Sequence, residues 1–127
     1  MTTATFTIPG ELCDLNSYID AERTNRYTAS KIKKEETERV AMEAHISGIR
    51  PITQFPVHMR FSWYTKDLRK DIDNISFAKK FAMDGLVLAG VLPDDSRKYV
   101  AGYDGEYFYI GKENPRVVVE IIEYESG

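Results

Sequence analysis

The most constraining feature of this sequence is an alternation of apolar and polar residues between Phe55 and Tyr64. Every second side chain in this stretch is apolar, namely Val57, Met59, Phe61 and Trp63. Successive side chains of a β-strand point to opposite faces of the sheet, so the pattern predicts a strand with one buried and one exposed face. The fold therefore contains a sheet with at least one half-buried strand.

Four further segments are expected to be strands, because they are short and bounded by turn residues. They span residues 5–8, 99–103, 106–110 and 116–123. The dipeptide Asp104-Gly105 separates the second from the third of these segments, and such a dipeptide is typical of tight hairpin turns. We therefore expect residues 99–110 to form a β-hairpin.

The segment before the alternating strand predicts one helix. Thr28 or Ser30 is expected to cap it, and it runs to about Ser47. Gly48 stops it. Its charged residues are dense, so most of its surface is expected to face solvent. Residues 11–27 are expected to be an irregular loop.

A second helix is expected from about Asp73 to Leu88, ending at Gly90. A turn over residues 92–95 follows it. The resulting order, β-α-β-α-β-β-β, predicts an α+β fold in which two helices pack with a mixed β-sheet.

Length and cysteine content limit the class of protein. The chain has 127 residues, 43% of them apolar, which fits a single domain over residues 1–127. Cys13 is the only cysteine, which excludes intramolecular disulfides and predicts a reducing, cytoplasmic setting. No stretch resembles a membrane span or a secretory signal, so no membrane partner is expected.

The charge distribution bears on nucleic acid binding. The formal net charge of −3 argues mildly against it. However, the segment from Arg23 to Lys34 contains five basic residues and no acidic one. A chain that is acidic in total can therefore still present one basic face.

Two pairs of carboxylates are candidates for a metal site. Asp71 and Asp73 lie at the start of the second expected helix, and Asp94 and Asp95 follow its end. Converging carboxylates repel one another, and a divalent cation relieves that repulsion. Oxygen-only ligands favour Mg²⁺, with Mn²⁺ as a substitute, over zinc. Such a site can orient a water molecule and stabilise the leaving oxygen of a phosphoryl displacement.

The same carboxylates also have an ordinary structural interpretation. An aspartate before a helix is a common N-cap, and two aspartates after a helix form a common turn. Spacing alone favours this interpretation over a metal site. An EF-hand is excluded, because Ser76 stands where that loop requires glycine.

A longer pattern surrounds the carboxylates. Residues 69–74 read Arg-Lys-Asp-Ile-Asp-Asn, and Lys80, Asp84-Gly85-Leu86 and Asp94-Asp95-Ser96 follow. Near the ends stand Ile8-Pro9-Gly10, Asn25-Arg26-Tyr27 and Asn114-Pro115-Arg116-Val117. Taken together, these motifs resemble the RusA-like Holliday-junction resolvases, especially those of phages and prophages. The resemblance covers most of the chain, and the combined pattern is specific, although Asp-x-Asp-Asn alone would be weak.

The resemblance implies a dimeric RusA-like fold and a Mg²⁺-dependent endodeoxyribonuclease with no organic cofactor. Such an enzyme resolves four-way DNA junctions by paired symmetric nicks that leave 5′-phosphate ends, in recombination and repair. Its partners would be branched DNA and a second copy of the chain. Carried over by position, Asp71, Asp73 and Asp95 are the catalytic metal ligands, and Asp94 is either a further ligand or a group that supports the ligands. A phage or prophage origin and a bacterial cytoplasmic setting are implied as well.

The resemblance also implies a catalytic lysine. Counting back from Asp84 selects Lys80, whereas counting forward from Asp73 reaches Phe77, which cannot fill the role. Seven residues make about two helical turns, so Lys80 would return to the face of Asp73, roughly 10 Å along the axis. Lys79 lies off that face and is the alternative.

DNA contacts are expected from basic and polar residues near the carboxylates and in the first half of the chain. Side chains of this kind neutralise or bind phosphates. The candidates are Arg69 and Lys70, then Asn16, Arg23, Asn25 and Arg26 in the expected loop, then Lys31 and Lys33 on the first helix. A solvated loop and an exposed helix face are the alternatives.

Three other functions remain open at this point. A nuclease for flaps or replication forks would carry the same site. A catalytically idle junction-binding module would not need Asp71, Asp73 and Asp95 together. A structural or regulatory protein would bind no DNA, and it would show no steeply salt-dependent association with a junction.

Overall fold

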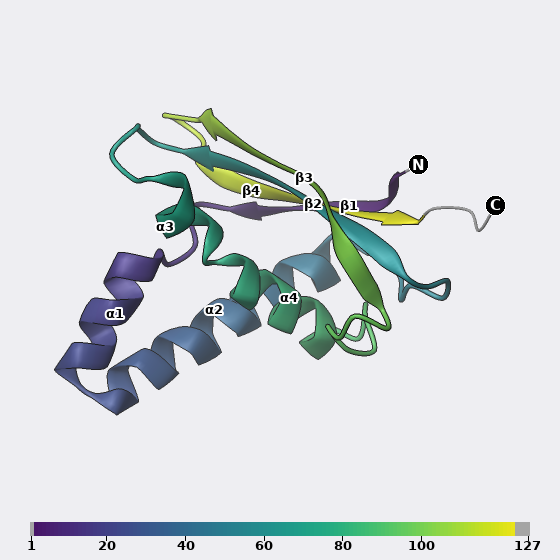
Figure 1. The fold of residues 1–127 in the computed structure, drawn as a ribbon, viewed down its shortest axis with the longest axis horizontal. Helices are drawn as coiled ribbons and strands as arrows, with labels where there is room; N and C mark the ends of the chain where they lie inside the picture. The colour runs from purple at the N-terminus through teal and green to yellow at the C-terminus, as the bar shows by residue number, and fades with distance from the viewer. Residues whose placement is uncertain (1, 124–127) are drawn as a thin grey trace.

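The computed structural model describes residues 2–123 and confirms an α+β domain with a mixed sheet. Figure 1 shows the helices packed on one side of that sheet. The elements in chain order are β1 (Thr2–Pro9), α1 (Leu15–Thr24), α2 (Arg26–Ile46), β2 (Val57–Thr65), α3 (Ile72–Ser76), α4 (Lys79–Leu88), β3 (Val100–Ile110) and β4 (Arg116–Glu123).

The sheet has the strand order β1-β4-β2-β3. Strand β4 pairs antiparallel with both β1 and β2, whereas β2 and β3 are parallel. Parallel neighbours need a crossover connection, and α3 and α4 provide it here. This crossover sets α4 and the loop that follows it against β3.

The alternation in β2 is confirmed, because its side chains are buried at every second position. Val57, Met59, Phe61 and Trp63 belong to the core, together with Phe81, Leu86 and other apolar residues of the helices. A Cβ atom on Gly85 would lie 2.5 Å from the side chain of Val40. Only glycine therefore lets α4 cross α2 at this distance.

The expected loop over residues 11–27 is wrong, because most of it forms α1. Asp14 caps this helix by accepting a hydrogen bond from the Ser17 N–H, and Asn25 caps α2 by accepting one from the Thr28 N–H. The second cap also corrects the expected start of the next helix at Thr28 or Ser30. The segment is short and polar on average, and Ala21 is its buried residue, which is why its composition resembles that of a loop.

The expected pair of helices is likewise wrong, since the described residues form four. The segment expected to be one continuous helix is broken at Phe77 and Ala78 into the short α3 and the longer α4. Helix α4 begins at Lys79, so the expected spacing of two unbroken turns between Asp73 and Lys80 does not hold.

The expected hairpin over residues 99–110 is also wrong, because this segment is the single strand β3. Its partner is β2, and the register shifts where Met59 faces Tyr103 but Arg60 faces Gly105. The extra residue forms a bulge at Asp104-Gly105, where Gly105 has a φ of 155°. The bulge turns Tyr103 and Glu106 to the same side of the sheet, the side that the helices cover.

Candidate functional site

A groove lies between the start of α4, the loop after α4 and the start of β3. Its volume is about 430 Å³. We call it the Lys80 groove; it is lined by Lys79, Lys80, Met83, Asp95, Arg97 and residues 100–103. Lys80 and Asp95 are both residues that the sequence predicts to be catalytic. The fold therefore brings two predicted site residues to one concave surface.

Lys80 is held by two carboxylates in this groove. Its Nζ lies 3.1 Å from Asp84 Oδ1 and 3.7 Å from Asp95 Oδ2, and its side chain remains about half exposed. The hydrogen bond to Asp84 and the charges of Asp84 and Asp95 outweigh partial burial and raise the pKa of Lys80. The ammonium is therefore charged at neutral pH, and it can stabilise negative charge but cannot act as a general base.

Lys79 points to a different partner. Its Nζ lies 2.8 Å from Glu106 Oε1 and 4.5 Å from the centre of the Tyr103 ring. The other carboxylate oxygen of Glu106 accepts a hydrogen bond of 2.8 Å from Trp63 Nε1. These contacts fix Lys79 to the wall formed by β3. They favour Lys80 over Lys79 for the lysine role, which stays a prediction.

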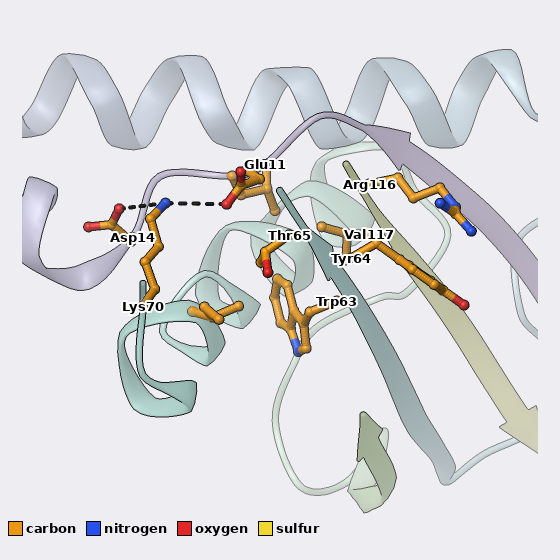
Figure 2. A pocket seen from close by; sticks show the side chains of 10 residues that line it. Glu11, Asp14, Trp63, Tyr64, Thr65, Lys70, Arg116 and Val117 are labelled. Atoms are coloured by element: carbon orange, nitrogen blue, oxygen red, sulfur yellow. Dashed lines mark hydrogen bonds and ion pairs between the residues drawn. The ribbon is translucent and has the colours of Figure 1, made fainter. Parts of the chain in front are cut away.

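A second charged cluster lies at the opposite end of β2. Lys70 Nζ is 2.9 Å from Asp14 Oδ2 and 3.3 Å from Glu11 Oε1, and we call these three residues the Lys70 cluster. Figure 2 shows the lysine between the two carboxylates. Together with Trp63, Thr65, Ile75 and other residues, they line a small recess of about 10 Å³, roughly enough for one water molecule. They also border an open surface depression of about 330 Å³.

The charges of the Lys70 cluster compensate one another. Burial alone lowers the pKa of Lys70, but the hydrogen bond to Asp14 and the charge of Glu11 outweigh it and raise the pKa. Burial likewise favours neutral Asp14, yet hydrogen bonds from Ser17 and Lys70 lower its pKa. The DNA contact expected of Lys70 stays a prediction, but a phosphate would have to compete with two carboxylates.

The Lys70 cluster holds the segment that carries the first aspartate pair. Asp71 and Asp73 follow Lys70 directly, and both are exposed. The side-chain oxygen of Asn74 accepts a hydrogen bond of 2.9 Å from the backbone N–H of Asn16, which ties α3 to α1. The Lys80 groove is lined by Asp95 but not by Asp71 or Asp73 in the described part of the chain.

The predicted metal ligands do not form a complete protein cage. Among residues 2–123, no group of three or more His, Cys, Asp or Glu side chains is arranged to hold a metal ion. Asp71, Asp73, Asp94 and Asp95 are all exposed. A cation bound by these residues would therefore need oxygen ligands from elsewhere. Mg²⁺ sites commonly combine one or two carboxylates with waters and substrate phosphates.

The other predicted DNA-binding residues lie apart from the Lys80 groove. Arg23, Asn25 and Arg26 stand at the turn between α1 and α2, which Figure 1 places at the opposite end of the molecule from the loop between α4 and β3. On α2, Lys31 pairs with Glu35 at 3.9 Å, and Lys33 is exposed. Arg69 is exposed and lies 3.7 Å from Asp67.

Several residues of these two regions are absent from the sequence-based expectations. Glu11 and Asp14 lie far from Lys70 in sequence, so no local sequence pattern indicates their contact. The bulge that turns Tyr103 and Glu106 toward Lys79 is equally invisible in the sequence. Arg97 is the exception, because a cation two residues after Asp95 gives a local signal.

The chain has no match among protein-family models or curated proteins. Within residues 2–123, no helix combines the length and the apolar character needed to traverse a lipid bilayer.

Proposed function

We propose that the protein is a Mg²⁺-dependent endonuclease that cuts branched DNA, in particular four-way junctions. The motifs from Arg69 to Ser96 and their resemblance to RusA-like resolvases support this proposal. The structural observation that supports the proposal most is the 3.7 Å contact between Lys80 and Asp95 in a groove of about 430 Å³. The family pattern requires a lysine and this aspartate in one site, and their positions in sequence do not by themselves bring them together.

The roles proposed for the side chains follow from their charge. The Lys80 ammonium would stabilise the charge that develops on the phosphoryl group as the strand is cut. Asp71, Asp73 and Asp95, with Asp94 as a further ligand, would supply the carboxylate oxygens for the cation. When bound, Mg²⁺ would polarise a phosphoryl oxygen and activate a water molecule. The DNA phosphates would complete the coordination that the carboxylates leave open.

A homodimer belongs to the same proposal. Two-fold symmetry would place two equivalent sites against opposed strands of a junction, which accounts for paired nicks. Action in a bacterial cytoplasm and a phage or prophage origin rest on the resemblance alone.

The experiment is incubation of the protein with a labelled synthetic four-way junction and Mg²⁺. We expect paired symmetric nicks with 5′-phosphate ends. Asp73→Asn should lower the cutting rate by about 10²-fold or more and leave junction binding in place. Asp20→Asn, at an exposed carboxylate of α1, is the matched control and should cut like the wild type.

Two outcomes would contradict the proposal. Equal cutting by Asp73→Asn and the wild type would place the activity in another site or another protein. Junction binding without cutting by the wild type would favour a non-catalytic binding module. A parallel panel of flaps and forks distinguishes the nuclease for other branched DNA from a junction resolvase.

A further inference from the structure

The Lys80 groove contains a cation that the proposed mechanism does not use. Arg97 lines the groove beside Lys79 and Lys80, and Asp95 is the carboxylate among the lining residues. Lys79 is paired with Glu106, and Lys80 with Asp84 and Asp95. Arg97 is exposed and forms no ion pair with any of residues 2–123. It is therefore the cation of this groove whose charge is available to a ligand.

The chemistry of the groove indicates what such a ligand carries. A guanidinium group presents several N–H donors in a planar fork that matches two phosphate oxygens, whereas an ammonium acts as a point charge. The volume of about 430 Å³ is far larger than a single phosphate needs. Met83, Val100 and Ala101 add apolar lining against which a sugar can pack. A phosphate joined to a sugar fits this combination.

The wall of the groove is fixed before a ligand binds. The bulge at Asp104-Gly105 sets Tyr103 and Glu106 on the same side of β3. Lys79 contacts both of these residues, and Trp63 anchors Glu106 from the core. Binding therefore requires little ordering of this wall, which lowers the entropic cost of holding a strand.

From these observations we propose that the Lys80 groove seats the DNA backbone and that Arg97 binds a phosphate next to the one that is cut. This inference rests on the proposed function. Two residues of extended chain span at most about 7 Å, so Arg97 stays close to Asp95. Arg97 is a binding residue in this proposal, and Lys80 and Asp95 remain the groups that face the reacting phosphate.

The test is binding of a fluorescent four-way junction, measured by anisotropy in EDTA over a series of salt concentrations. Without a divalent cation no strand is cut, so binding is measured by itself. Arg97→Ala should weaken binding about 10-fold, and the slope of log Kd against log salt should fall by about one. Arg97→Lys should keep the slope and recover part of the affinity. Arg50→Ala, at an exposed arginine outside the groove, should match the wild type.

A second measurement separates this inference from the proposed function. With Mg²⁺ present, Arg97→Ala should raise KM about 10-fold while kcat stays close to the wild-type value. Wild-type affinity and salt slope in Arg97→Ala would overturn the inference even if the protein cuts junctions normally. A wild-type protein that binds no junction DNA would overturn the proposed function and the inference with it. A thermal melt of each variant shows that the loop substitution leaves the fold intact.

Discussion

The Lys70 cluster and the Lys80 groove contain the same chemical groups but differ in how far these groups are exposed to solvent. Each places one lysine between two carboxylates, at 2.9 and 3.3 Å in the cluster and at 3.1 and 3.7 Å in the groove. The lysine side chain is 31% exposed in the cluster but 55% exposed in the groove. The carboxylates that contact the lysine are 20% and 11% exposed in the cluster, and 23% and 37% exposed in the groove.

This difference in exposure distinguishes a lysine that stabilises the fold from a lysine whose charge is available to a ligand. When an ion pair is buried, each charge loses its hydration and is stabilised mainly by its partner. Removing one partner therefore lowers the free energy of unfolding substantially. Exposed ion pairs contribute little to stability and can exchange partners. We therefore assign the Lys70 cluster to holding α1, β2 and α3 together, and we propose the Lys80 groove for binding and cutting. Four predictions test this division, from the largest expected effect to the smallest.

The largest effect is expected from Lys80→Met. Removing the ammonium should slow junction cutting by about 10²- to 10³-fold, because a preorganised charge no longer stabilises the reacting phosphate. The free energy of unfolding should change by less than about 0.5 kcal/mol, since the ion pair is exposed. Single-turnover cutting rates and urea unfolding curves measure the two quantities. Lys112→Met is the control. A large loss of stability in Lys80→Met would show that Lys80, like Lys70, holds the fold together, which contradicts the assignment.

The next effect concerns Cys13, which adjoins the Lys70 cluster. Burial raises the pKa of its thiol from 9.0 to about 11, and the charges of Asp14 and Glu36 add to this. At pH 8 the folded protein should react with a thiol reagent about 100-fold more slowly than the unfolded chain, because only the thiolate reacts. Absorbance from a disulfide reagent, with and without urea, measures both rates. Similar rates would mean that the cluster is open to solvent.

A smaller effect is expected from Lys70→Met. The substitution leaves Glu11 and Asp14 without their cation, so the free energy of unfolding should fall by about 2 kcal/mol at pH 7. Urea unfolding measures it, and Lys66→Met, at the exposed lysine of the same loop, should change it by less than about 0.5 kcal/mol. Unchanged stability in Lys70→Met would show that the cluster does not hold the fold together.

The smallest effect is a change in pH dependence. The folded pKa of Asp14 lies below its ordinary value of 3.8, so its contribution to stability is present above that pH and is lost as the pH falls through the folded pKa. Lys70→Met removes part of this depression. The difference in stability between wild type and variant should therefore shrink below about pH 4. Unfolding curves at pH 3 and pH 7 test this, and a difference that grows in acid would contradict it.

The sequence predicts those parts of the fold that depend on local pattern. The alternation in β2 and the position of Pro115 before β4 are local signals, and both strands form as expected. Helix α1 is missed because the segment is short and polar on average, with Ala21 as its buried residue, so that its composition resembles that of a loop. The single strand β3 is missed because parallel pairing with β2 and a bulge override a dipeptide that resembles a hairpin turn.

The same limit applies to the charged residues. Lys70 and Lys80 look alike in the sequence, since each stands close to aspartates. Their difference depends on distant neighbours, because Glu11 and Asp14 pair with Lys70 and leave it 31% exposed, whereas Lys80 beside Arg97 and β3 is 55% exposed. Asp71 and Asp73 remain predictions, because within residues 2–123 they do not form a metal-binding group with Asp95.

The central claim is that branched DNA occupies the Lys80 groove, and site-specific crosslinking tests it most directly. In a Cys13→Ser background, a photo-crosslinker is attached through Ala101→Cys in the groove, or through Thr7→Cys on the uncovered side of β1. Each protein is irradiated with a labelled four-way junction in EDTA. We predict strong capture from position 101, suppressed by unlabelled junction, and only background capture from position 7. Equal capture from the two positions, or stronger capture from position 7, would contradict the account.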